Sequence, residues 1–466
     1  MKKPNIISIL IDDLGARDLG CYGSTFYETP NIDKLASEGL VFTDAYASCP
    51  VCSPSRASMM TGKYPARVGV TEWIGGDTKG KLLGAPYLHY LPLEEVCIAK
   101  AMKKGGYRTW HVGKWHLGTE EYYPEKHGFD VNIGGCHRGA PNNGYFAPHG
   151  LHNLEGGNSD EYLTDRITDE AIKLIEQESD EPFFLNLCHY AVHVPLVAKQ
   201  NDIDYFTEKA KKLKLDRFNA ITLGEKYPIE DKKSSCVERR HIQSHPVYAA
   251  MIYNLDQNIG KLMDALKATG KDKDTIVFFT SDNGGLSTEF LCPTCNAPFS
   301  EGKGWMYEGG VREPLIIWGK GIEKRRFCTV PVTTPDFYPT FLELAGLPLM
   351  PEQHVDGVSL VPLINGENKL EREAIYWHYP HYGNQGGTPG CSVRMGDYKL
   401  IEFFEDSRLE LYNLKTDVSE LNNLADEMPE LREKILGKLN AWLDDVCAKI
   451  PQPNPNWKAK PEMKRS

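Results

Sequence analysis

The chain has 466 residues, of which 41% are hydrophobic and 25% charged, a composition typical of a soluble globular protein that excludes fibrous and disordered chains. The 53 Lys and Arg residues are outnumbered by 64 Asp and Glu residues, and the net charge of −11 argues against nucleic acid or a membrane surface as a partner. A chain of this length forms about three domains, or one large domain with a small one.

The N-terminus carries no recognisable targeting segment. Its apolar run, residues 6–11, stops at Asp12 and is too short for the hydrophobic region of a signal peptide. No apolar run approaches the roughly 20 residues of a membrane span. The twelve cysteines are scattered along the chain, which indicates reduced thiols rather than a disulfide framework. We therefore expect a cytoplasmic protein, or an extracytoplasmic one if a signal has been removed.

Short apolar runs alternate with helical patterns over the first 345 residues. The expected strands are residues 5–11, 41–47, 108–112, 182–187, 275–280 and 314–318, and the expected helices are 30–36, 93–104, 160–178, 245–269 and 336–344. This alternation predicts an α/β fold, with a large, mainly parallel sheet between helices. Ligands of such sheets bind beyond the carboxyl ends of the strands. Since strands 5–11 and 275–280 both run into acidic residues, we expect them to share one site.

The C-terminal part has a different pattern. Residues 346–369 are rich in Pro, Gly and Asn, so we place a domain boundary there, with domains 1–369 and 370–466. The second domain is expected to be a small α+β unit that contributes to the substrate pocket. Its antiparallel strands and closing helix are predicted at residues 374–377, 392–395, 398–404, 410–413 and 429–449.

Residues 52–62, Cys-Ser-Pro-Ser-Arg-Ala-Ser-Met-Met-Thr-Gly, carry the most specific motif. They resemble the signature of the type I, formylglycine-dependent sulfatases of the alkaline phosphatase superfamily, with Met60 replacing a leucine. In that family the motif cysteine is oxidised to formylglycine, whose aldehyde hydrates to a geminal diol. The resemblance assigns this role to Cys52, and Arg56, one helical turn later, would hold the diol. The alternative is an ordinary buried cysteine before a helix.

Asp12, Asp13, Asp282 and Asn283 follow the two strands that end in acidic residues. Three carboxylates and an amide oxygen are hard ligands that suit Ca²⁺, with Mg²⁺ also possible. The lack of paired His or Cys ligands argues against zinc. Together with the modified Cys52, these four residues match the metal ligands of the family. The metal would bind sulfate oxygens and stabilise the ionised diol.

Three further strings resemble family motifs: G-K-W-H-L-G at 113–118, H-x-P at 193–195 and G-K-G with Y-E-G-G at 302–310. The resemblance makes four residues of these strings candidate catalytic residues, which are Lys114, His116, His193 and Lys303. By resemblance, one diol oxygen attacks sulfur, and Lys114, Lys303 and Arg56 stabilise the charge. His193, with Lys303, would protonate the alkoxide oxygen of the departing group. His116 would deprotonate the remaining hydroxyl, so that sulfate leaves.

Residues 377–387 are dense in His, aromatic and amide groups and resemble the recognition loop of exo-acting carbohydrate sulfatases. The alternative is a buried loop that joins two domains. We expect removal of a terminal sulfate from N-acetylgalactosamine or galactose of glycosaminoglycans, with 4-O sulfate the first choice and 6-O the second. The expected substrate contacts are His378 and His381, then Trp73, His137 and Arg138.

This interpretation implies two partners, a sulfated saccharide as substrate and a formylglycine-generating maturase. One alternative is a phosphatase or phosphodiesterase of the same superfamily, but these carry Thr or Ser as nucleophile and two transition metals. Another is a non-catalytic carbohydrate-binding relative, which would be expected to lack a ligand or the nucleophile. Cys292 and Cys295 have the spacing of a zinc or redox pair but no second pair, so they are expected to be a loop feature.

Overall fold

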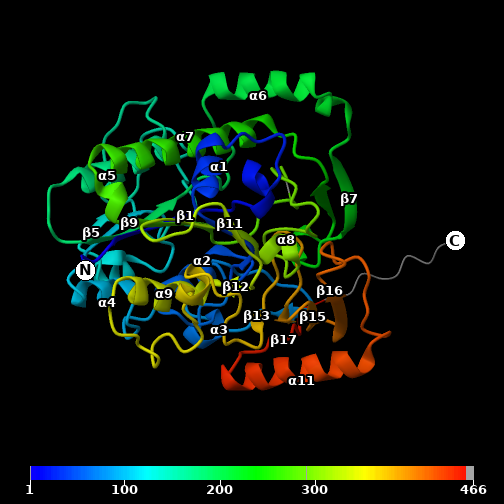
Figure 1. The fold of residues 1–466 in the computed structure, drawn as a ribbon. Helices are drawn as coiled ribbons and strands as arrows, with labels where there is room; N and C mark the ends of the chain where they lie inside the picture. Colours follow the sequence, from blue (N-terminus) through cyan, green and yellow to red (C-terminus); the bar gives the residue numbers. More distant parts are fainter. Residues whose placement is uncertain (1, 290, 458–466) are drawn as a thin grey trace.

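The computed structural model describes residues 2–289 and 291–457, and a nine-stranded sheet forms its centre (Figure 1). The strand order is β11-β2-β10-β9-β1-β6-β4-β5, with β12 also paired to β2. The strands are β1 (Asn5–Ile11), β2 (Leu40–Tyr46), β4 (Arg108–Gly113), β5 (Val131–Ile133), β6 (Phe183–His189), β9 (Thr275–Ser281), β10 (Arg312–Gly319), β11 (Arg326–Cys328) and β12 (Val332–Thr333). The predicted mainly parallel sheet is confirmed, since only β10 runs antiparallel to its neighbours.

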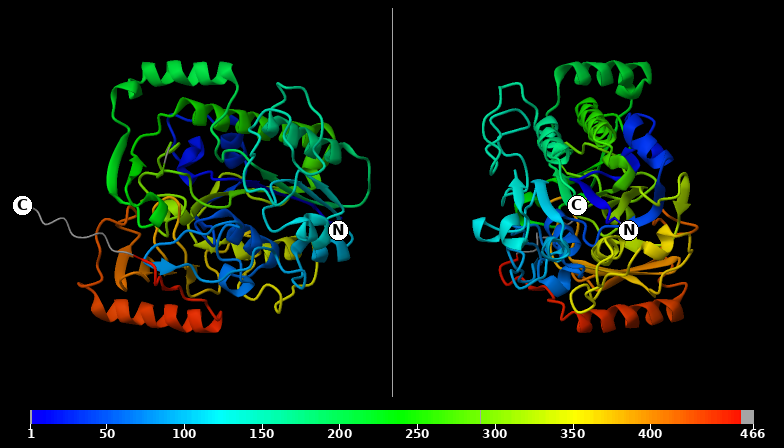
Figure 2. Two further views of the ribbon diagram at one scale, coloured as in Figure 1. Left: turned by 180° about the vertical axis from the view of Figure 1, so that it is seen from behind. Right: turned by 60° about the vertical axis from the view of Figure 1, so that its left-hand side comes forward.

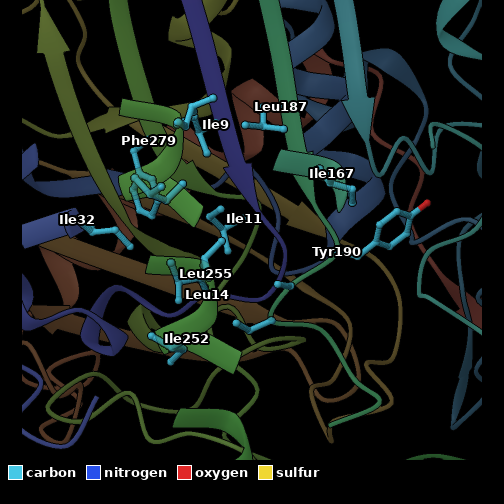
Figure 3. Close-up of a cluster of buried hydrophobic side chains, with 14 of the residues drawn as sticks. Ile9, Ile11, Leu14, Ile32, Ile167, Leu187, Tyr190, Ile252, Leu255 and Phe279 are labelled. Carbon is cyan, nitrogen blue, oxygen red and sulfur yellow. The ribbon is translucent and has the colours of Figure 1, made fainter. Parts of the chain in front are cut away.

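Helices cover both faces of this sheet because successive residues of each buried strand point to opposite sides. In β1, Ile7, Ile9 and Ile11 belong to one core cluster, and Ile6 and Leu10 belong to another. Figure 3 shows Ile9 close to Phe279 of β9 and Ile11 close to Leu255. The first face is covered by α1 (Pro30–Ser37), α5 (Leu163–Glu176) and α7 (Pro246–Ala268), and the second by α2 (Cys52–Thr61), α4 (Ile98–Lys104) and α9 (Phe337–Leu344).

The C-terminal unit contains the expected antiparallel sheet and helix. Its order is β13-β14-β15-β16, and α11 packs on the sheet through buried apolar side chains (Figures 1 and 2). Val393, Leu400 and Leu411 from the strands meet Ile435 and Leu439 from the helix. The elements are β13 (Ile375–Tyr379), β14 (Gly390–Met395), β15 (Tyr398–Phe403), β16 (Arg408–Asn413) and α11 (Pro429–Asp445).

The remaining elements are short or lie at the surface. α6 carries only two buried side chains, and β7 with β8 forms a hairpin whose first strand is mostly exposed. Within residues 2–289 and 291–457, no helix has the length and apolar character needed to cross a membrane. The short and surface elements are α3 (Pro65–Val68), α6 (Gln200–Lys212), α8 (Glu308–Val311), α10 (Val361–Ile364), β3 (Leu82–Leu83), β7 (Ile221–Lys226), β8 (Cys236–Arg240) and β17 (Gln452–Pro453).

Candidate active site

The acidic residues that follow β1 and β9 lie together because these strands are adjacent and parallel. Asp12 and Asp13 come directly after β1, and Asp282 comes directly after β9. The backbone turns sharply at Asp13, where φ is 62°, and the Asp13 amide donates to Asp282 Oδ1 at 3.2 Å. All three side chains are buried. The geometry therefore brings three carboxylates to one point at the carboxyl edge of the sheet.

Arg56 and Lys114 face two of these carboxylates. Arg56, on α2, donates from Nε to Asp282 Oδ2 at 2.8 Å, and its Nη2 lies 2.7 Å from the same oxygen. Its Nη1 donates to the Lys114 carbonyl at 3.0 Å, which ties α2 to the segment after β4. Lys114 Nζ contacts both oxygens of Asp12, at 2.7 and 2.8 Å. Buried charges are tolerated only when they are paired in this way.

Lys303 and His193 face the third carboxylate. Lys303 Nζ lies 2.8 Å from Asp13 Oδ2, and His193 Nε2 lies 3.6 Å from the same oxygen. Although burial alone would raise it, Lys303 and then His193 and Lys114 hold the pKa of Asp13 well below its usual range. Burial and the neighbouring Lys303 lower the pKa of His193 to about 3. Asp13 is thus a carboxylate, and His193 is a neutral imidazole at physiological pH.

Cys52 is the first residue of α2, a helix that is buried along its whole length and ends at Gly62 in a left-handed conformation. Its Sγ lies 3.4 Å from His116 Nδ1. Burial raises the pKa of the Cys52 thiol, although Lys114 and Lys303 act against this effect. A cysteine nucleophile needs a lowered pKa, so the unmodified thiol is poorly suited to thiolate chemistry.

The donor atoms at this point fit a hard divalent cation. Asp12, Cys52 and Asp282 each offer one ligand atom, and these atoms lie within 4.8 Å of one another. Asn283 donates its amide hydrogens to Asp13 Oδ1 at 2.8 Å and to the Gly284 carbonyl, whereas its buried Oδ1 has no hydrogen-bond partner. A buried acceptor without a partner is unusual and suits a metal ligand. Asp12, Asp13, Asp282 and Asn283 would hold Ca²⁺ or Mg²⁺ through oxygen.

A cavity of about 410 Å³ opens over Cys52, and His116, His193 and Lys303 line it. Of the expected substrate contacts, Trp73, His137 and Arg138 are on the lining. Nine further lining residues were not predicted, which are Ile74, Gly139, Ala140, Asn142, Val194, Leu286, Glu289, Asn384 and Gln385. Asn384 and Gln385 belong to the loop of residues 377–387, whose amide content was the available signal. Glu289 and Ile74 come from loops that carry no motif.

His378 and His381, the first two expected substrate contacts, are not among the residues that line this cavity. His378 lies within β13, is buried, and contacts the Lys449 carbonyl through Nε2 at 3.0 Å. His381 is also buried and contacts Thr71 Oγ1 through Nε2 at 2.9 Å. The His378 contact lies within the small unit, whereas the His381 contact joins the small unit to the large one.

Comparison with known proteins identifies the family. The Sulfatase family model matches residues 4–347. The chain belongs to the sulfatase family. A second model, N-sulphoglucosamine sulphohydrolase, C-terminal, matches residues 301–448. The expected resemblance and the expected class of enzyme, a sulfatase that hydrolyses sulfate esters, are therefore confirmed.

Three similar proteins can be aligned with most of the length of this sulfatase. A protein named Sulfatase from Formosa agariphila is 32% identical, over 97% of this chain and 92% of its own length. Rat N-acetylgalactosamine-6-sulfatase is 31% identical, over 85% of this chain and 71% of the relative. The crystal structure of Ps i-CgsB in complex with k-i-k-neocarrahexaose is 30% identical, with a TM-score of 0.75 over 98% of this chain and 95% of that one.

Proposed function

We propose that this sulfatase removes a terminal 6-O or 4-O sulfate from N-acetylgalactosamine or galactose in glycosaminoglycan fragments, using formylglycine made from Cys52. The observation that carries the proposal is the position of Cys52, which starts a buried helix and lines a cavity together with His116, His193 and Lys303. A cavity of about 410 Å³ suits one sugar with its sulfate better than a continuous polymer.

The choice of sugar is supported by the relatives. Rat N-acetylgalactosamine-6-sulfatase shares 31% identity with this chain, and Ps i-CgsB was crystallised with a neocarrahexaose. The name of the rat relative supports 6-O sulfate as the first choice and 4-O sulfate as the second, the reverse of the order expected from the sequence. Asn384 and Gln385 offer amides on the cavity wall that suit hydrogen bonds to sugar hydroxyl groups.

The polar side chains of the site lie where they can act on the sulfate ester and on the side chain of residue 52. Lys303 and His193 lie on the Asp13 side, where they suit the departing sugar oxygen. His116, with Nδ1 3.4 Å from the side chain of residue 52, is placed to take a proton from a group there. Arg56 and Lys114 would balance the negative charge of the sulfate. Formylglycine would supply a hydroxyl nucleophile, and the bound cation would supply charge stabilisation.

The test combines mass spectrometry with turnover. Purified protein, co-expressed with a formylglycine-generating maturase, is expected to contain formylglycine at position 52 and to release sulfate from 6-O- or 4-O-sulfated N-acetylgalactosamine. Cys52→Ala is expected to lose this activity while keeping the parent melting temperature. Full turnover with an unmodified Cys52 thiol, or undiminished turnover by Cys52→Ala, would show the proposal to be wrong. Faster hydrolysis of aryl phosphate than of aryl sulfate would favour the phosphatase alternative.

A further inference from the structure

A second cavity lies beside the first and shares two residues with it. Its volume is about 470 Å³, slightly larger than that of the cavity over Cys52. His137 and Arg138 line both cavities, so they form a common wall. The rest of the second cavity includes Tyr123, His149 and His152. The two spaces together are large enough for two neighbouring sugars of an oligosaccharide.

Arg138 is an unusual arginine at this wall. Its Nη1 is buried and has no hydrogen-bond partner, and no ion pair joins its side chain to a carboxylate within the described part of the chain. Arg108 also has buried nitrogens without a hydrogen-bond partner, but its guanidinium lies over the Trp110 ring and lines neither cavity. Arg56 and Arg239 are paired with Asp282 and Glu225. A guanidinium with a buried, unpaired N–H is costly unless a ligand completes its hydrogen bonds.

The groups around Arg138 do not supply that missing partner. His137 is occupied by the Tyr123 hydroxyl, which lies 3.0 Å from its Nδ1, and the two rings stack at an interplanar angle of 10°. Glu289, the acid on the wall of the first cavity, is paired with Lys232. Glu155, the acid on the wall of the second cavity, is exposed. The arrangement leaves one fixed positive charge between two cavities.

We infer that the second cavity binds the sugar next to the one that loses its sulfate, and that Arg138 binds an anionic group on that neighbouring sugar. The group is a carboxylate or a second sulfate ester, since both match the forked N–H groups of a guanidinium. This inference rests on the proposed function and adds to it a preference for oligosaccharides with a charged neighbour. Arg138 would then determine specificity without contacting the reacting sulfate.

The test compares kcat/KM for disaccharides that carry the same reactive sulfate and differ only in the neighbour. The three neighbours are a neutral sugar, a uronate and a sulfated sugar, so that the two anions are distinguished. The parent is expected to prefer one or both charged neighbours by about 10- to 100-fold, the effect of one charge-assisted hydrogen-bonded pair. Arg138→Gln is expected to reduce that ratio to about 1. Arg138→Lys, which keeps the charge but not the fork, should fall between them.

Arg217→Gln is the matched control, because it removes one positive charge from an exposed residue that lines neither cavity. It should retain the parent ratio. A parent with no preference for a charged neighbour, or an Arg138→Gln variant that keeps the preference, would overturn the inference. If sulfated monosaccharides are hydrolysed in that case, only the inference fails. If no sulfated sugar is hydrolysed by protein that carries formylglycine, the proposed function fails with it.

Discussion

Lys399 occupies the most informative position for a stability experiment, because it is a lysine with no exposed side-chain surface between two buried carboxylates. Its Nζ lies 3.0 Å from Glu308 Oε1 and 3.0 Å from Glu420 Oε1. Glu308 begins α8, five residues after Lys303 of the candidate active site, whereas Lys399 belongs to the small C-terminal sheet. The Lys399–Glu308 pair therefore joins the two parts of the molecule near Lys303, and the Lys399–Glu420 pair lies within the C-terminal part.

The magnitude follows from these contacts. At an effective dielectric constant of about 20, each pair at this separation gains roughly 5 kcal/mol before desolvation, and removal of one partner from a buried pair costs about 3–5 kcal/mol net. In Lys399→Met, Glu308 keeps Arg312, whose Nη1 lies 3.1 Å away. Glu420 is left without a cation. We therefore expect Lys399→Met to lower the free energy of unfolding by about 3–5 kcal/mol in mildly alkaline buffer.

This loss should depend on pH. Burial raises the pKa of Glu420 to about 7 even with Lys399 in place, whereas Lys399, Arg312 and Arg394 overcome burial and lower the pKa of Glu308 to about 2. Removing the lysine raises the pKa of Glu420 further above its unfolded value. The free-energy penalty of the unpaired Glu420 carboxylate is therefore absent below the pKa of Glu420 in the unfolded chain. It grows as the pH rises through the pKa of Glu420 in the folded protein. Lys399→Met should accordingly lose less stability at about pH 5 than at about pH 8.

The assay is urea unfolding of the parent, Lys399→Met, Glu420→Gln and the double variant at both pH values. Glu420→Gln keeps an oxygen that can accept the Glu308 amide hydrogen, which donates to Glu420 Oε2 at 2.7 Å. The double variant buries one negative charge fewer and should recover most of the stability lost at high pH. A loss below about 1 kcal/mol for Lys399→Met, or no recovery in the double variant, would refute the electrostatic reasoning.

Three further predictions concern the candidate active site and its surroundings. Arg56→Lys keeps the charge but loses the forked contact with Asp282, so kcat for sulfate release should fall by about 100-fold in steady-state kinetics; parent-like turnover would contradict this. Adding Ca²⁺ to chelator-treated protein should stabilise it by about 2.7 kcal/mol at 100 times the Kd, as measured by melting temperature, and Asn283→Leu should abolish most of this shift. Burial raises the pKa of Glu72 to about 8, so the parent loses stability as the pH rises from about 4.5 to 8. Relative to the parent, the stability of Glu72→Gln should increase by up to about 5 kcal/mol over that interval, and an unchanged stability difference at all pH values would disprove this prediction.

The large sheet could be predicted because its strands are buried on both faces and read as short, continuous apolar runs. Strand direction has no such signature. β10 fits the same apolar pattern as its neighbours, and its antiparallel direction is visible only in the structure. α6 and the β7–β8 hairpin are not among the elements expected from the sequence. Their side chains are mostly exposed, so their composition carries little of the periodicity that burial imposes.

The candidate site could be predicted where its residues fall in ordered motifs at the ends of strands. Asp12, Asp282 and Arg56 are separated widely in sequence, and the structure brings them together because β1 and β9 are neighbours. The substrate wall was predicted less well. His378 and Gln385 come from one polar segment, yet only Gln385 reaches the cavity, because His378 is fixed within a strand. Residue type does not specify which side chains of a loop face a cavity.

The charge of the site clarifies how an acidic protein can bind an anion. Three carboxylates, Asp12, Asp13 and Asp282, are each paired with one cation, so the protein groups at this point nearly cancel. The neighbouring His193 adds no charge at neutral pH, since its pKa is lowered to about 3. Attraction for a sulfate ester must then come from a divalent cation held by these carboxylates or from a cation outside the pairs. Arg138 is such a cation, on the cavity wall and without a carboxylate partner among the described residues. Removing the divalent cation should therefore weaken binding of the reacting sulfate, whereas Arg138→Gln should weaken the preference for a charged neighbour, and the two effects should be separable in KM measurements.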